Sequence, residues 1–147
     1  MKTVILYYTF GGATMAEAER LGKELPCSVY RIREIKKRCL LTSFIPGGFQ
    51  AMKQKMVPVT KPDINLDEFD DIMIGCPIWA NYPAPAFNSI VSWLPKGKHV
   101  DLFFMSGSGN PLPHEKIIVQ AILDKGCEVV SIRNVKTGKP PHKMKEK

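Results

Sequence analysis

The feature that most constrains the fold is a repeated succession of a short apolar run, a tight turn and a stretch with helical periodicity. Residues 4–8 form an uninterrupted apolar and aromatic run, which suits a strand buried on both faces. After a glycine-containing turn, Ala18, Leu21 and Leu25 recur at helical spacing until Pro26 ends the pattern. Such alternation predicts parallel strands joined by right-handed crossovers.

The rest of the chain continues this alternation. Further strands are expected at 27–33, 71–76, 100–105 and 128–132. The first of these alternates apolar residues with arginines, as an edge strand does. One helix is expected to bury Ile117, Ile118, Ala121 and Ile122 and to end before Gly126, and a short helix is expected at 49–56. The chain is therefore predicted to be an α/β protein with a doubly wound, five-stranded parallel sheet of order 2-1-3-4-5.

The last predicted strand is followed by Lys136-Thr137-Gly138-Lys139-Pro140-Pro141, where this winding usually has a closing amphipathic helix. We expect a domain over residues 1–135 and a basic, disordered tail over 136–147, which holds five Lys and one Glu. Without that helix, apolar side chains near strands three to five would be exposed. An exposed apolar patch marks an interface, so we predict a homodimer or a partner chain on that face.

The first turn has the chemistry of a phosphate site. It reads Thr9-Phe10-Gly11-Gly12-Ala13-Thr14. The two glycines allow the backbone to approach a ligand, and the threonines place hydroxyls beside the free amides of a helix start. Such a terminus binds a phosphate without Lys or Arg. The alternative is an ordinary strand-to-helix turn capped by Thr14.

The second turn, Gly75-Cys76-Pro77-Ile78-Trp79, is expected at the same carboxyl edge of the sheet. Nearby prolines stiffen a loop that carries Trp79 and Tyr82 at its tip, and a rigidly held ring is a stacking platform. The alternative is that Trp79 covers a neighbouring helix. A phosphate site and a stacking ring at one edge together suggest bound flavin mononucleotide (FMN).

With these two turns, the chain resembles the flavodoxin family, whose phosphate loop has the form (Thr/Ser)-x-(Thr/Ser)-Gly-x-(Thr/Ser). Thr9, Gly12 and Thr14 match this pattern, whereas Gly11 departs from it and removes one hydroxyl. Trp79 falls where such flavodoxins place the aromatic residue that stacks on the flavin ring. The resemblance covers Met1 to about Arg133, and the segment 77–80 is most similar to the bacterial flavodoxin-like and NAD(P)H:quinone-reductase-like branches.

The resemblance further implies a third flavin-contacting loop at 106–110, which lacks the second stacking aromatic of many electron carriers. One face of the ring would then stand open to a substrate or partner. The expected flavin-contacting residues are Thr9, Phe10, Gly11, Gly12, Ala13, Thr14, Pro77, Ile78, Trp79, Ala80, Asn81, Tyr82, Ser106, Gly107, Ser108, Gly109 and Asn110.

Residues that other functions of α/β proteins require are missing from this sequence. A phosphoacceptor receiver needs carboxylates after strands one and three, where this chain has Tyr8-Thr9 and residues 75–77. Gly107-Ser108-Gly109 is followed by Asn110-Pro111 rather than by the third glycine of a dinucleotide fingerprint. Phosphate-loop NTPase and nucleophile-elbow motifs are missing from the sequence. No basic residue accompanies Cys76 in its turn, so we expect a buried small side chain rather than a thiolate.

The cysteine pattern and the net charge indicate the compartment and the kinds of partner to expect. The four cysteines are widely separated and no histidine stands at metal-ligand spacing, which predicts free thiols in the cytoplasm and no metal site. We expect neither an export signal nor a membrane span, because the opening apolar run is short and is followed by glycines and a Glu-bearing amphipathic stretch. The net charge of +7 comes largely from the tail and from the basic residues between 31 and 38. The sequence has no nucleic-acid-binding motif beside these charges. We therefore expect a solvated edge and tail rather than binding to nucleic acid.

Three functions remain open. The first is a flavin-dependent oxidoreductase that passes electrons from a nicotinamide to a quinone or similar small acceptor. The second is a one-electron carrier that docks on redox proteins as donor and acceptor. The third is a binding scaffold without flavin. The positive charge and the missing second aromatic favour the first, in which the redox chemistry belongs to the cofactor and no catalytic side chain is expected.

Overall fold

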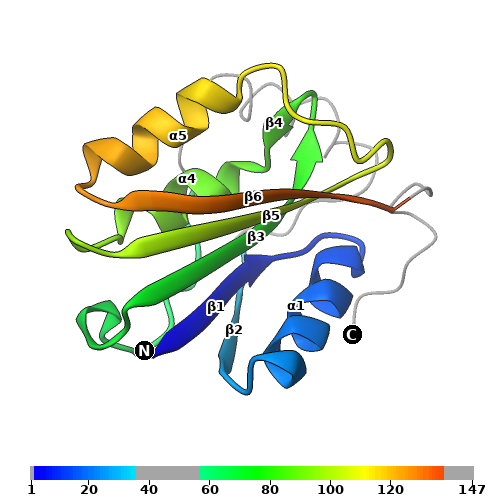
Figure 1. Ribbon diagram of the computed structural model, residues 1–147. Coiled ribbons are helices and arrows are strands. Elements are labelled where there is room, and N and C mark those ends of the chain that lie inside the picture. The colour runs from blue at the N-terminus through cyan, green and yellow to red at the C-terminus, as the bar shows by residue number, and fades with distance from the viewer. Residues whose placement is uncertain (1, 36–56, 138–147) are drawn as a thin grey trace.

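The computed structural model describes residues 2–35 and 57–137, and Figure 1 shows their arrangement. The elements, in chain order, are β1 (Thr3–Tyr8), α1 (Ala13–Glu24), β2 (Ser28–Ile32), the 3-10 helix η2 (Leu66–Glu68), β3 (Asp71–Trp79), β4 (Tyr82–Pro83), α4 (Pro85–Ser92), β5 (His99–Ser106), α5 (Glu115–Asp124) and β6 (Glu128–Lys136).

The main sheet has the order β2-β1-β3-β5-β6, and all its neighbouring strands are parallel. This confirms the predicted doubly wound fold, since β5 and β6 are the fourth and fifth strands of the predicted order. The short strand β4 was not predicted and pairs antiparallel with the end of β3. Strand β3 is also longer than expected, because it continues through Trp79.

Helices cover the two faces of the sheet unequally (Figure 1): α1 lies on one face, and α4 and α5 lie on the other. The larger apolar core, under α4 and α5, includes Leu6, Ile74 and Phe104. A smaller core lies under α1 and includes Ile5 and Phe103. Successive residues of a strand point to opposite faces, so the apolar runs of β1, β3 and β5 supply both cores.

Gly126 ends α5 as predicted. It has a φ of +80°, its amide donates to Leu123 O at 2.9 Å, and the next amide, of Cys127, donates to Ile122 O at 3.3 Å. This pair of bonds is a Schellman motif, which favours glycine. The predicted apolar face of the helix is only partly right, because Ile118 and Ile122 are buried whereas Ile117 is exposed. Leu25, expected on the buried face of α1, is likewise exposed where the helix ends.

On the face where α1 is the single described helix, the apolar side chains of β3 and β5 are buried. The Phe103 ring lies over Gly75 so closely that a Cβ at Gly75 would overlap it, and Phe103 is fully buried. Nearer the edge the face is polar, because Ser131 Oγ donates to Asp101 Oδ1 at 2.6 Å. Val130 of β6 is 57% exposed, but Met73, Phe103 and Met105 are at most 9% exposed, so the described residues do not show the expected apolar patch over strands three to five. The homodimer or partner chain on this face stays a prediction.

Several expectations lie outside the described residues: the helix at 49–56, Cys39 and most of the tail. Within the described ranges, β6 extends to Lys136, and the Thr137 amide donates to Ser106 O at 2.8 Å, so the last strand continues past residue 135. The two sides of the gap meet, since the Ile35 amide donates to Pro58 O at 3.1 Å. Among the described helices, none has the length and apolar character needed to span a membrane.

Candidate functional site

The candidate site lies at the carboxyl ends of β1, β3 and β5. These strands are parallel neighbours in the sheet, so the segments that follow them emerge at one edge (Figure 1). That edge is where ligands bind in open α/β sheets. The structure thus brings together the three predicted segments, 9–14, 77–82 and 106–110, although each differs in detail from its prediction.

The loop after β1 is organised by Thr9. Its hydroxyl oxygen accepts a hydrogen bond from the Gly12 amide at 2.9 Å, and the side chain is buried. Gly12 has a φ of +103°, which glycine adopts readily, and forms the N-cap of α1. Thr14 is buried in the first helical turn and makes no capping bond. The alternative of a turn capped by Thr14 is therefore wrong, because the cap is Gly12.

The amino end of α1 has the chemistry of an anion site. The amides of Ala13, Thr14 and Met15 have no carbonyl one turn earlier in the helix to accept from them. No acidic residue occupies the first turn, so no carboxylate there competes for these donors. The helix dipole adds positive potential at the same place. A phosphate group fits this donor set.

The segment after β3 is a hairpin rather than a loop. Strands β3 and β4 pair antiparallel around Ala80 and Asn81, whose φ values are +51° and +67°. Two consecutive residues with positive φ define a type I′ turn, the common connection of two-residue hairpins. The hairpin is anchored at its base, where the Ala84 amide donates to Pro77 O at 3.0 Å. The tip of this segment is therefore Ala80-Asn81.

Trp79 does not lie at that tip. Its side chain is only 3% exposed and meets two rings edge-on, Tyr8 at 6.1 Å and Phe10 at 5.9 Å between centroids. The expectation of a ring presented to a ligand at the loop tip was wrong, because β3 extends through Trp79. The residue instead joins the end of β1 to the loop after it. Stacking of Trp79 on a planar ligand stays a prediction.

An aromatic contact that was not predicted connects the hairpin to the loop before α5. The rings of Tyr82 and His114 stack at 5.0 Å between centroids with an interplanar angle of 11°. His114 is exposed at the N-cap of α5. No local pattern indicates the stack, because it depends on how two loops from different strands meet.

The loop after β5 is held by its own serines and by the end of β6. Ser106 Oγ accepts from the Gly109 amide at 2.9 Å, and Ser108 Oγ accepts from the Asn110 amide at 3.2 Å. Gly109 has a φ of +72°, and a Cβ there would lie 2.9 Å from Lys136 Cβ. Around Gly107, by contrast, no heavy atom of the described residues lies within 4 Å of the Cβ position, apart from Gly107 itself and its two chain neighbours. The loop therefore borders open space on one side.

Other candidate chemistry at this edge is weak. Burial raises the pKa of the Cys76 thiol far above its usual range, only partly offset by a backbone hydrogen bond at Ala84, so a thiolate is disfavoured. Cys27, Cys76 and Cys127 are free thiols. Within residues 2–35 and 57–137, no group of three His, Cys, Asp or Glu side chains is placed to hold a metal ion.

Comparison with solved structures identifies the fold. The flavoprotein from Lactobacillus acidophilus NCFM, solved in complex with FMN, is similar with a TM-score of 0.76 and 22% identity, over 89% of this chain and 91% of that chain. Its apo-form matches with a TM-score of 0.70 and 22% identity, over 91% and 92%. The two-electron reduced flavodoxin of Megasphaera elsdenii matches with 0.54 and 22%, over 95% and 90%.

No protein-family model and no curated protein matches the sequence. These three structural matches, each at 22% identity, show that the chain has the flavodoxin-like fold.

Proposed function

We propose that this protein binds FMN at the carboxyl edge and acts as a flavin-dependent oxidoreductase that passes electrons from a nicotinamide to a quinone or similar small acceptor. The observation that carries the proposal is the loop from Thr9 to α1, where a buried hydroxyl fixes Gly12 and leaves the first helix amides for an anion. The similarity to an FMN complex of the same fold supports it.

The described residues fit the phosphate end of FMN better than the ring end. Gly12 and the first amides of α1 would hold the phosphate. For the ring, Trp79 is only 3% exposed and meets Phe10 edge-on, whereas Tyr82 is half-buried. When bound, FMN would supply hydride and electron transfer, and the chain would supply orientation and electrostatics.

One observation favours an enzyme over a one-electron carrier. The segment 106–110 offers no aromatic side chain, and the space beside Gly107 is open. A small acceptor would have access to the ring from this side. Three free thiols in the described residues support the expected reducing compartment, the cytoplasm.

The test is titration of the purified protein with FMN and with riboflavin, which lacks the phosphate, followed by flavin fluorescence. We expect the wild-type protein to bind FMN more tightly than riboflavin. Consumption of NADH or NADPH in the presence of a quinone would then support the enzyme, whereas reduction only by a redox protein would support the carrier. Failure to bind either flavin would contradict the proposal.

Two glycines provide a matched pair of variants. Gly12 and Gly97 both have positive φ, at +103° and +81°, but Gly97 lies at the opposite edge of the sheet with nothing within 4 Å of its Cβ position. Replacing each by alanine imposes a similar backbone strain of about 1–2 kcal/mol. We expect Gly12→Ala to weaken FMN binding and Gly97→Ala to leave it unchanged. Equal loss of affinity in both variants would contradict the phosphate placement.

A further inference from the structure

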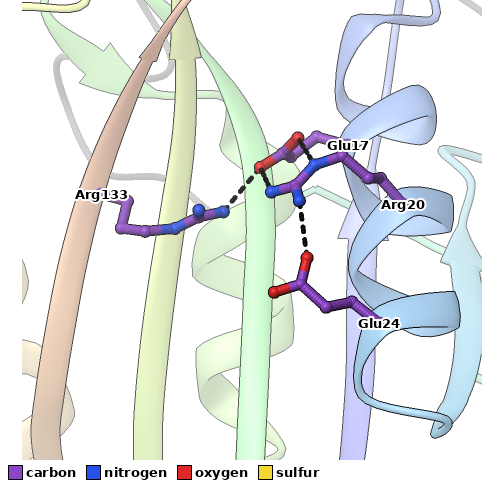
Figure 2. A network of polar contacts seen from close by, with 4 residues as sticks. All are labelled: Glu17, Arg20, Glu24 and Arg133. Carbon is purple, nitrogen blue, oxygen red and sulfur yellow. Dashed lines mark hydrogen bonds and ion pairs between the residues drawn. The ribbon is translucent and has the colours of Figure 1, made fainter.

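A cluster of four charged residues connects α1 to the edge strand β6 (Figure 2). Glu17 is its centre. Arg20 donates to both carboxylate oxygens of Glu17, from Nε to Oε1 and from Nη2 to Oε2, each at 2.9 Å. Arg133, from β6, donates from Nη2 to Oε2 at 2.6 Å. Glu24 completes the cluster by accepting from Arg20 Nη1 at 2.7 Å.

Glu17 is the shielded member of this cluster. Its side chain is 12% exposed, against 52% for Arg20, 42% for Arg133 and 61% for Glu24. Hydrogen bonds from Arg20, and next from Arg133, hold the pKa of Glu17 below its usual value despite partial burial, which acts in the opposite direction. Both arginines thus favour the ionised form of this carboxylate.

The position of Glu17 has a structural reason. The Glu17–Arg133 bond joins residues 116 apart in sequence, across the face of the sheet on which α1 is the single described helix. Arg133 pairs in register with Phe103, which points to the same face. The bond thus holds β6 to α1 on the side where the expected closing helix is not found in the described residues.

The same position places a negative charge near the proposed phosphate site. Glu17 lies four residues after the start of α1, about 6 Å along the helix axis, and helical side chains lean towards the amino end. A lone carboxylate there would oppose an anion bound at the first amides. Two guanidinium groups on one carboxylate remove that opposition.

We propose that Arg133 is a charge-compensating residue of the FMN phosphate site: by pairing with Glu17 it keeps the amino end of α1 attractive to the phosphate. The inference rests on the proposed function. Arg133 acts through Glu17 and touches neither substrate nor cofactor, so it is a positioning residue rather than a catalytic one.

The experiment compares Arg133→Met, Glu17→Gln and the double variant by FMN and riboflavin titration at low salt. Both single variants lose the tether and should melt at lower temperature. We expect opposite shifts in FMN affinity, weaker in Arg133→Met and tighter in Glu17→Gln, each by about threefold to tenfold. The double variant should return near wild type. Riboflavin affinity should stay constant across the series.

Glu24→Gln is the matched control. Like Glu17→Gln, it removes one negative charge that pairs with Arg20, but this charge lies about 10 Å further along α1. We expect it to change FMN affinity less than twofold. The shifts in the Glu17 and Arg133 variants should shrink at high salt, where such interactions are screened.

The outcomes separate this inference from the proposed function. If the wild-type protein binds neither flavin, the proposed function and the inference both fail. If it binds FMN and both single variants weaken binding together, the cluster is only a tether, and the inference alone is overturned.

Discussion

The two faces of the sheet are closed in different ways. Under α4 and α5, aromatic and aliphatic side chains form the larger core, where the rings of Phe87 and Phe104 meet edge-to-face at 5.6 Å. On the opposite face α1 is the single described helix, and the area beyond it is closed by Phe103 lying over Gly75 and by the Glu17–Arg133 pair.

The comparison shows two ways of covering a flavodoxin-like sheet: two described helices cover one face, and a single described helix covers part of the other. The α4/α5 face uses the hydrophobic effect over a broad area, whereas the α1 face uses one closely fitted ring and charge-assisted hydrogen bonds. Charge-assisted bonds respond to pH and salt, and close packing responds to small changes in volume. The two faces should therefore respond differently to substitution.

The largest effect is expected on the α4/α5 face. Phe104→Ala should lower the free energy of unfolding by about 4 kcal/mol, because it leaves a cavity in the larger core. Met73→Ala, at the margin of the smaller core, should cost about 2 kcal/mol. Urea denaturation measures both, and equal losses would contradict the unequal division of the core.

Gly75→Ala tests the close packing of the α1 face. The added methyl would overlap the Phe103 ring, so we expect a loss of about 2–3 kcal/mol. Combining it with Phe103→Leu should give less than the sum of the two single losses, because the smaller side chain makes room. Simple additivity in this double-mutant cycle would show that the ring does not limit the space at Gly75.

Glu17→Gln tests the ion pair through its pH dependence. At neutral pH we expect a loss of about 1–2 kcal/mol, since hydrogen bonds to a charged group are lost. The pKa of Glu17 is lowered in the folded state, so its contribution is present above the unfolded pKa and disappears as pH falls through the folded pKa. The difference between variant and wild type should therefore begin to shrink as the pH falls below the unfolded value of about 4.3 and vanish only below the lower pKa of the folded state. A difference that persists there would mean that packing, rather than charge, is responsible.

The smallest effect is expected from Ser131→Ala. Its hydroxyl donates to Asp101 in an exposed position, where water replaces a lost bond. Thermal unfolding should show a loss of under about 1 kcal/mol. A larger loss would mean that the polar edge of the α1 face contributes as much to stability as its packed part.

The sequence predicted the buried strands and their order well, because a strand buried on both faces is a run of apolar residues and can be recognised from residue types alone. The run at 4–8 and the glycine after α5 both lie where predicted. The helix faces were harder to predict: Ile117 follows the same periodicity as Ile118, but what covers a residue depends on the neighbouring elements.

The candidate site was predicted in place but not in detail. Thr9 and Gly12 follow from the turn after the first strand, as the structure shows. The burial of Trp79 did not follow, because an apolar segment with a proline gives no sign that β3 continues into a hairpin. The Glu17–Arg133 pair joins distant parts of the chain, so no local spacing could indicate it.

The most direct test of the central claim, that the carboxyl edge is the ligand site, is the amide NMR spectrum of the protein during addition of FMN. We expect the signals of Gly12 to Met15 to move most, with further shifts at 80–82 and 106–110, while Gly97 and His99 at the opposite edge stay unchanged. Shifts concentrated at the opposite edge or on the exposed side of α5, or no shifts at all, would contradict the claim.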